Sequence, residues 1–257
     1  MILAIDIGNS NIVLGIFKDD KLSFVSRLST DFRKTSDELA AMICQVLSLK
    51  GVAPADIVDS ILSTVVPSLL QPMESAIETI TGRKPLLVAP GIKTGLNVKI
   101  DNPSQLGSDM LTDCVAASNL YPKPVIVLDL GTATTVSAVD KDNNFIGGAI
   151  MPGVMTGLNA LIERTAQLPQ IAIEAPKHAI STNTNDSMQS GIVFGTAAML
   201  DGMIERFEEE LGCEAFVVAT GGLSGEISKH TRKKVVHNPN LLIEGLYIIY
   251  KKNVRKA

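Results

Sequence analysis

The sequence predicts an α/β protein made of two duplicated halves that face each other across a cleft. The first observation is Val125 to Thr135 (VIVLDLGTATT), a short apolar run that ends in an aspartate and a glycine-containing turn. The second is Met1 to Asp6 (MILAID), which leads into a similar turn at Gly8. Apolar runs of this length are typical of buried strands, and such a turn at a strand's end can hold a phosphate.

The third observation is that each half carries a later strand that ends in small polar residues. These strands are Ser60 to Val66 in the first half and Ala215 to Gly222 in the second. A pattern that recurs at a fixed spacing is better evidence than either copy alone. We therefore expect one half at residues 1–120 and the other at 121–257.

Composition limits the classes of function. Apolar residues make up 46% of the 257 residues, and the net charge is −4 with most basic residues scattered, so we expect no nucleic-acid partner. Cys44, Cys114 and Cys213 are far apart, which favours reduced thiols and a cytoplasmic location. No apolar run approaches the roughly 20 residues of a membrane span, so we expect no membrane partner.

In the first half, residues 2–17 and 22–28 are expected to form three strands, the second turn lying at Asp19-Asp20. Thr35 and Glu38 have the spacing of a capping box and predict a helix that Gly51 ends. The other expected elements are a strand at 61–66, a helix from Pro67 to about residue 80, a strand at 85–89, a polar connection at 91–107 and a helix at 108–120.

In the second half, residues 133–139 are expected to return antiparallel to the strand that ends at Asp129. Further elements are expected as a strand at 145–150, helices at 156–164 and 187–211, a last strand ending at Gly221-Gly222 and a helix at 243–252. Gly191, Gly195 and Gly202 interrupt the long helix. Because helical glycines are unfavourable, they indicate close approach either of another helix of this chain or of a partner chain.

Asp109 lies at or near the start of the helix expected at 108–120. Asp and Ser are favoured at helix N-caps, so Ser108 or Asp109 has a purely structural interpretation. The alternative is that Asp109 is a catalytic carboxylate, and the local sequence leaves both open.

Two carboxylates at strand ends, each beside a polar turn, suit a magnesium nucleotide. Phosphoryl transfer needs donors on the phosphate oxygens and carboxylates near the metal, and Asp6, Asn9, Ser10, Asp129 and Thr132 supply them. Gly221-Gly222 would let a nucleoside lie against bare backbone. A single Asp-x-Gly is more often an ordinary turn, but two copies favour a nucleotide site. No Walker A motif and no Gly-x-Gly-x-x-Gly after a strand are present.

A series of motifs runs along the chain in order. They are Asp6 to Ser10 with Gly15, Asn102-Pro103, Leu106 to Asp109, Asp129 to Thr135, Gly147-Gly148 to Pro152-Gly153, Arg164 to Pro169, Asn183-Thr184, Ser187 to Gly191 and Ala219 to Gly222. Together they resemble the motifs of type III pantothenate kinases, within the superfamily of actin-like, sugar-kinase and heat-shock ATPases. This resemblance implies duplicated actin-like (ribonuclease H-like) domains with mixed sheets flanked by helices, and an active-site cleft between the halves.

The resemblance also implies an activity: phosphorylation of the primary hydroxyl of pantothenate to 4′-phosphopantothenate by Mg-ATP, the first step of coenzyme A biosynthesis. It implies a homodimer that needs a monovalent cation, potassium or ammonium. Asp109 would be the base, Asp129 would bind the monovalent cation, and Asp6 would bind magnesium directly or through water. The implied ATP-binding residues are Asp6, Ile7, Gly8, Asn9, Ser10, Asn11, Ile12, Val13 and Thr132. The implied pantothenate-binding residues are Ile100, Gly107, Ser108, Asp109, Met110 and Thr184.

The chain departs from the family pattern at two positions of the acceptor site. Met110 stands where the family usually has an arginine, and Ile100 where it usually has a tyrosine. Both usual residues donate hydrogen bonds that Met and Ile cannot make. Two alternatives therefore stay open: a diverged paralogue with a changed acceptor, and an ATP-binding regulator without catalysis.

Overall fold

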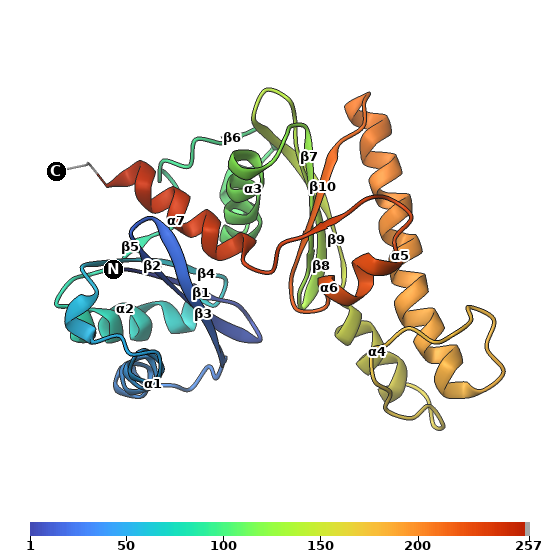
Figure 1. Cartoon of the computed structure of the whole chain (residues 1–257), viewed down its shortest axis with the longest axis horizontal. Helices are drawn as coiled ribbons and strands as arrows, with labels where there is room; N and C mark the ends of the chain where they lie inside the picture. Colours follow the sequence, from blue (N-terminus) through green and yellow to red (C-terminus); the bar gives the residue numbers. More distant parts are fainter. Residues whose placement is uncertain (255–257) are drawn as a thin grey trace. The chain divides into compact units, whose positions relative to one another are not determined.

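The computed structural model describes residues 1–254, and its contacts divide the chain into two compact units (Figure 1). Unit 1 contains Met1–Gly95, Asn102–Ala116 and the C-terminal segment from Asn240. Unit 2 contains Leu96–Asp101 and Ala117–Pro239. The chain thus leaves unit 1, builds most of unit 2 and then returns. The sequence analysis divides the chain differently, into halves at residues 1–120 and 121–257, and that division stays a prediction.

Unit 1 is built on a mixed sheet with the strand order β3-β2-β1-β4-β5 within the described residues. Its strands are β1 (Ile2–Ile7), β2 (Asn11–Lys18), β3 (Lys21–Ser29), β4 (Asp59–Thr64) and β5 (Leu86–Leu87). The first three form the expected antiparallel meander, whereas β4 runs parallel to β1. Asp19 and Asp20 both have positive φ, which suits the tight turn between β2 and β3.

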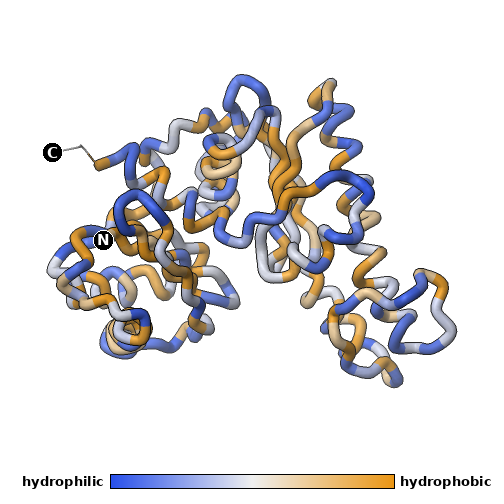
Figure 2. Tube along the Cα trace, viewed as in Figure 1, coloured by the Kyte–Doolittle hydropathy of each residue, from blue (hydrophilic) through white to orange (hydrophobic). Residues whose placement is uncertain are grey.

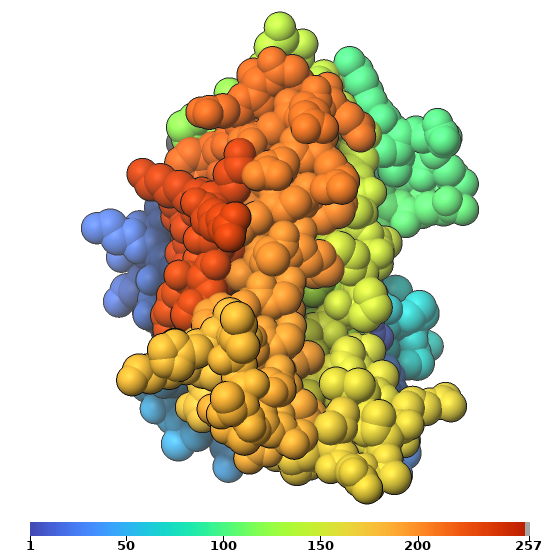
Figure 3. Space-filling view, turned by 90° about the vertical axis from the view of Figure 1, so that its right-hand side faces the viewer, coloured from blue at the N-terminus to red at the C-terminus, as the bar shows by residue number. Residues whose placement is uncertain are grey.

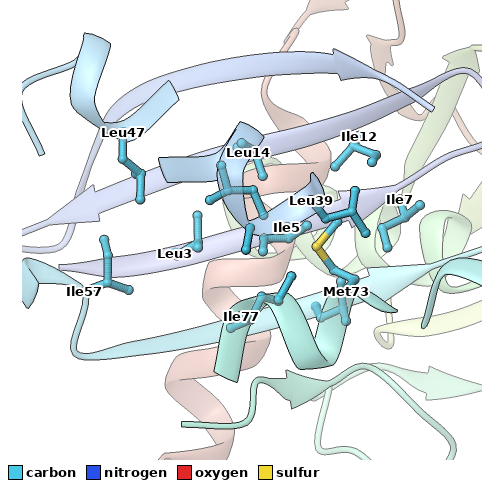
Figure 4. Packing of buried hydrophobic residues seen from close by; sticks show 14 of the residues in the cluster. Leu3, Ile5, Ile7, Ile12, Leu14, Leu39, Leu47, Ile57, Met73 and Ile77 are labelled. Carbon is cyan, nitrogen blue, oxygen red and sulfur yellow. The ribbon is translucent and has the colours of Figure 1, made fainter. Parts of the chain in front are cut away.

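One face of this sheet packs against α1 (Ser36–Leu49) and α2 (Pro67–Thr81). Figure 4 shows the packing, with Leu3 and Ile5 of β1 beside Leu39 of α1 and Ile77 of α2. The predicted capping box begins α1, since Thr35 and Glu38 bond reciprocally. The opposite face carries α7 (Leu241–Asn253), whose Ile243 side chain fills the space that a side chain on Gly15 would need. Asp6 lies on the α7 face, because side chains alternate along β1.

Unit 2 repeats the same topology in its mixed sheet, ordered β11-β10-β7-β8-β9-β6 in the described part of the chain. Its strands are β6 (Asn97–Val98), β7 (Val125–Leu130), β8 (Ala133–Val139), β9 (Asn144–Pro152), β10 (Phe216–Thr220) and β11 (Val236–His237). The antiparallel meander β7-β8-β9 corresponds to β1-β2-β3, and β10 is parallel to β7 as β4 is to β1. The predicted duplicated α/β fold is therefore confirmed, and Asp129 corresponds to Asp6.

The helices of unit 2 are α4 (Val154–Glu163), α5 (Thr184–Leu211) and α6 (Ser224–Ile227). Apolar residues of α5, among them Val193 and Ile204, pack on Ile126 and Leu128 of β7. Figure 2 shows β7 as a hydrophobic stretch, in keeping with its burial. α3 (Ser108–Leu120) links the two units in sequence and has the predicted bounds. Short 3-10 turns are η1 (Pro54–Asp56), η2 (Pro103–Gln105) and η3 (Ser228–His230).

The structure corrects three details of the sequence prediction. The connection at residues 91–107 contains β6 and η2, and β10 is followed by β11, so Gly221-Gly222 does not end the last strand. Helix α5 starts at Thr184 rather than residue 187, because the Asn183 side chain accepts a hydrogen bond from the Asp186 N–H and caps it. Strands β6 and β11 have two residues each, too few for a periodic pattern, and unlike β5 they were not expected.

Helix α5 runs along the face of the molecule seen in Figure 3. Among the described residues, no atom outside the helix backbone lies within 4 Å of where a Cβ on Gly191 or Gly195 would stand. Close packing within this chain therefore does not account for these two glycines, and the alternative of a partner chain stays a prediction. No helix in residues 1–254 is long and apolar enough to cross a membrane.

Candidate functional site

The turn between β1 and β2 is the first candidate phosphate site. The Gly8 N–H donates to the Asn11 carbonyl (3.0 Å), and the Thr30 hydroxyl donates to the Gly8 carbonyl (2.7 Å). The Thr30 N–H also bonds the Ser10 carbonyl at 3.1 Å. The side chains of Asn9, Ser10 and Asn11 are exposed. The backbone of the turn is thus held by Thr30, the residue after β3, while its polar side chains are exposed.

Asp6 lies just before this turn and is 5% exposed. Its Oδ1 atom accepts a 2.5 Å hydrogen bond from the hydroxyl of Ser63, which is fully buried on the neighbouring strand β4. Its Oδ2 atom lies 3.9 Å from where a Cβ on Gly8 would stand. The two carboxylate oxygens therefore point to different places, one to β4 and the other towards the turn.

The eight consecutive residues predicted to bind ATP, 6–13, differ in how far their side chains are exposed to solvent. Ile7 and Ile12 are in the hydrophobic core of unit 1, so only their backbone groups could reach a ligand. Val13 is partly buried in β2. Direct side-chain contacts to a phosphate are left to the exposed turn at residues 9–11, because the Asp6 carboxylate could act on a phosphate only through a bound cation.

The segment Gly107 to Met110 starts α3. The Ser108 hydroxyl donates to the Thr64 carbonyl at the end of β4 (3.1 Å), and the Met110 N–H donates to Asp109 Oδ1 (2.7 Å). Since the helix begins at Ser108, neither Ser108 nor Asp109 occupies the N-cap position. Asp109 does satisfy a backbone N–H of the first turn, which stabilises the helix, and its role as a catalytic carboxylate stays a prediction.

The end of β4 connects the two candidate groups of unit 1. Ser63 bonds Asp6, and the carbonyl of the next residue, Thr64, accepts from Ser108. Because β1 and β4 are parallel, their carboxyl ends lie at one edge of the sheet, where open α/β sheets bind ligands. The structure therefore brings the predicted phosphate turn and the predicted base to the same edge.

The turn after β7 is the equivalent feature of unit 2. The Gly131 N–H donates to the Ala133 carbonyl at 3.0 Å, and Thr132 is exposed. The Thr156 hydroxyl of α4 donates to the Thr132 carbonyl (2.8 Å). Gly153 packs so closely on the Thr132 carbonyl that no side chain fits there. Helix α4 thus supports this turn from its N-terminal end.

Asp129 and Gly221 are adjacent in unit 2. A Cβ on Gly221 would stand 2.5 Å from Asp129 Oδ1 and 2.6 Å from the Leu130 carbonyl oxygen, and Gly221 has a φ of 92°. Around Gly222, no atom of the described chain apart from its two sequence neighbours lies within 4 Å of the same position. The first glycine is thus required by packing, whereas the second leaves open space, and the nucleoside site expected at Gly221-Gly222 stays a prediction.

The residues predicted to bind pantothenate are divided between the units. Gly107 to Met110 belong to unit 1, whereas Ile100 and Thr184 belong to unit 2. Thr184, the first residue of α5, lines a cavity of about 700 Å³ with apolar Leu161, Leu168 and Ile192. Met110 and Ile100 are both partly buried.

Sequence reasoning missed Ser63 and the supports of Thr132. The strand Ser60 to Val66 was recognised as ending in small polar residues, which was the available signal for Ser63. Its pairing with Asp6 depends on the register of two strands that are 57 residues apart.

Comparison with solved structures shows similar folds over nearly the whole chain. A protein from Campylobacter jejuni assigned to the Baf family of transcriptional activators is 18% identical, with 98% of each chain covered and a TM-score of 0.63. Component A of (R)-2-hydroxyglutaryl-CoA dehydratase from Acidaminococcus fermentans is 17% identical, with 98% of each chain covered and a TM-score of 0.56. A protein from Sinorhizobium meliloti assigned as a 2-dehydro-3-deoxygalactonokinase is 14% identical, with 100% of this chain and 98% of that chain covered and a TM-score of 0.56.

These identities are low, so they establish the fold alone, that of actin-like and sugar-kinase ATPases. The family comparison goes further, because the model of type III pantothenate kinase matches residues 2–206. That range includes both phosphate-type turns, the start of α3 and the first residues of α5. The chain belongs to the type III pantothenate kinase family.

Proposed function

We propose that this protein is a kinase that transfers the γ-phosphoryl group of ATP to the primary hydroxyl of pantothenate, giving 4′-phosphopantothenate at the first step of coenzyme A biosynthesis. Membership of the family supports a phosphotransferase. The observation that carries the proposal is the position of Asp6 and Asp109 in unit 1. Both belong to segments attached to the last two residues of β4.

In this proposal Asp109 accepts the proton of the pantothenate hydroxyl as its oxygen attacks the γ-phosphorus. The bond from the γ-phosphorus to the bridging oxygen breaks, and ADP leaves with both electrons of that bond. Asp109 suits this role because its side chain is only partly buried and is oriented by the Met110 N–H. A general base of this kind contributes about 10²–10⁴-fold to a rate.

The turn at residues 8–11 and Thr132 would bind the ATP phosphates through exposed polar groups, and Gly222 would lie against the nucleoside. Magnesium, when bound, neutralises charge on the phosphates. Mg²⁺ is usually held by one or two carboxylates together with substrate phosphates. Asp6 fits this donor set with its Oδ2 atom directed towards the turn, and Asp129 is proposed to bind potassium or ammonium.

The acceptor half of the site supports a second candidate function. Met110 and Ile100 offer no side-chain donors to a polar acceptor, where the family usually offers an arginine and a tyrosine. A kinase that phosphorylates a different, less polar alcohol accounts for this substitution. A non-catalytic ATP-binding regulator explains it less well, since a pure binder has no need of Asp109.

We also propose that the protein acts as a homodimer, as the family resemblance implies. The support in this chain is the open surface at Gly191 and Gly195, two exposed residues of the long helix α5. Removing side chains from an exposed helix is unfavourable unless another backbone approaches there. Sedimentation equilibrium of the purified protein tests the proposal, and a monomer at micromolar concentration contradicts it.

The experiment that tests the activity is a coupled ADP-release assay with Mg-ATP and potassium, with and without millimolar pantothenate. Release that depends on pantothenate, with a product of the mass of 4′-phosphopantothenate, is the expected result. Equal background release in both samples contradicts the proposal and favours a changed acceptor. Replacing potassium with sodium in the same assay tests the monovalent site.

A further inference from the structure

We infer that Ser63 is a positioning residue for the proposed phosphoryl transfer: it fixes the Asp6 carboxylate so that Oδ2 is presented to the magnesium-bound phosphates. The inference rests on the proposed function, because it assigns a role at the same site. Ser63 lies outside the turns and outside the segment that carries the candidate base.

The contact itself has the features of a charge-assisted hydrogen bond. The Ser63 hydroxyl donates to Asp6 Oδ1 at 2.5 Å, within the range of about 2.5–2.7 Å for hydroxyl–carboxylate bonds. Ser63 is fully buried and Asp6 is 5% exposed, so little water competes for the bond. Such a bond strongly restricts rotation of the carboxylate.

The geometry also gives the carboxylate a direction. With Oδ1 held by β4, Oδ2 is the oxygen that points towards Gly8 and the exposed turn. The parallel register places Asp6 beside Ser63 and, in unit 2, places Asp129 beside Thr220. Both units therefore set a buried hydroxyl residue next to the aspartate at the strand's end. Because an aspartate lies beside a buried hydroxyl residue in both units, we attribute this arrangement to the duplicated site and not to the packing of unit 1 alone.

Ser63→Ala removes the donor and leaves a small buried methyl group. We expect the concentration of free Mg²⁺ that gives half-maximal binding of ATP to rise about 10- to 100-fold, as is typical when a partner of a metal ligand is lost. The maximal rate at saturating Mg²⁺ should change far less, because Asp6 itself remains. Ser63→Thr keeps the hydroxyl, as Thr220 does in unit 2, and should restore the wild-type Mg²⁺ dependence.

The chain offers a matched control on the same strand. Ser60 is also fully buried on β4, and its hydroxyl has no hydrogen-bond partner among the described residues. Ser60→Ala removes the same atom without touching Asp6, and we expect its Mg²⁺ dependence to be that of the wild type. Thermal unfolding without ligand shows whether all three variants are folded.

The measurement is calorimetric titration with ATP at a series of Mg²⁺ concentrations, followed by ADP release over the same series. A Mg²⁺ dependence that is shifted in Ser63→Ala but unshifted in Ser63→Thr and Ser60→Ala supports the positioning role. An unshifted Ser63→Ala overturns that role while leaving the kinase proposal standing. Wild-type protein that binds no ATP at any Mg²⁺ concentration overturns both.

Discussion

Gly107 lies against the carboxylate of Asp109 so closely that a Cβ on Gly107 would overlap the Oδ1 atom. The carboxylate of Asp109 can therefore keep this position only while residue 107 has no side chain. The contact explains why a glycine precedes the candidate base, and it makes the orientation of Asp109 testable without changing Asp109 itself.

Gly107→Ala should displace the Asp109 carboxylate and lower turnover by about 100-fold, since a misplacement of about 1 Å can have an effect of that size. Stability should fall by only about 0.5–1 kcal/mol, because alanine is a poorer residue than glycine before a helix. Steady-state kinetics and urea unfolding of the same sample check both expectations. Wild-type turnover in this variant would show that Asp109 needs no fixed orientation.

Asp109→Asn removes the proposed base but keeps the shape of the side chain and an oxygen that can accept from the Met110 N–H. We expect turnover to fall by at least about 100-fold and ATP affinity to stay unchanged. Calorimetry with ATP and a single-turnover assay separate these effects. Asp101→Asn, an exposed carboxylate eight residues earlier, is the control and should keep wild-type turnover. Full activity of Asp109→Asn would disprove its role as base.

Gly221→Ala and Gly222→Ala should separate packing from ligand binding. At Gly221 an added Cβ meets Asp129 and the Leu130 backbone at a φ of 92°, so we expect a loss of stability of about 1–3 kcal/mol or more. At Gly222 the described residues leave open space, so stability should change by less than about 0.5 kcal/mol while ATP affinity falls. Unfolding curves and ATP titrations distinguish the two. Equal ATP affinity in Gly222→Ala and wild type would show that the nucleoside does not bind against Gly222.

The capping box of α1 predicts a dependence of stability on pH. The Thr35 N–H (2.9 Å), the Lys34 ammonium and the Thr35 hydroxyl lower the pKa of Glu38 to about 2. Because the folded-state pKa is lower than the unfolded value of about 4.3, this stabilisation is complete above pH about 4.5 and is lost as the pH falls towards 2. Thr35→Ala should cost about 1 kcal/mol at pH 7.

Glu38→Gln is the control for this pH effect, since glutamine keeps the capping oxygen without the charge. The difference in unfolding free energy between wild type and Glu38→Gln should shrink between pH 4.5 and 2. A difference that is constant over this range would mean that Glu38 has the same pKa in the folded and unfolded states.

The substitutions in the acceptor half can be reversed. Met110→Arg combined with Ile100→Tyr restores the donors usual in the family and should lower the KM for pantothenate by about 10- to 100-fold, the size expected for one charged hydrogen bond. The ADP-release assay over a range of pantothenate concentrations provides the measurement. If the double variant releases no ADP in response to pantothenate, a changed acceptor becomes the better explanation.

Much of the fold follows from the sequence because its strands and helices have clear local patterns. The three strands β1 to β3 and the start of α1 follow from apolar runs, a turn at Asp19-Asp20 and a capping box. The bounds of α3 also agree with the prediction. By contrast, β6 and β11 have two residues each, and only their pairing partners define them.

The candidate site could be predicted only in part, for a similar reason. Asp6, Asp109 and Asp129 stand in recognisable motifs, but the contacts that orient them join distant segments. Ser63 reaches Asp6 through the register of parallel strands. The environment of the α5 glycines likewise depends on what packs around the helix, which no local pattern specifies.

The return of the chain to unit 1 decides when that unit can complete its packing during synthesis. Ile243 of α7 fills the space beside Gly15, and Tyr247 stacks on Phe17 with ring centroids 3.9 Å apart. A ribosome adds these residues after all the strands that the structure describes in unit 2. The face of the unit 1 sheet that α7 covers therefore has to wait for its packing partner until those strands of unit 2 have been made.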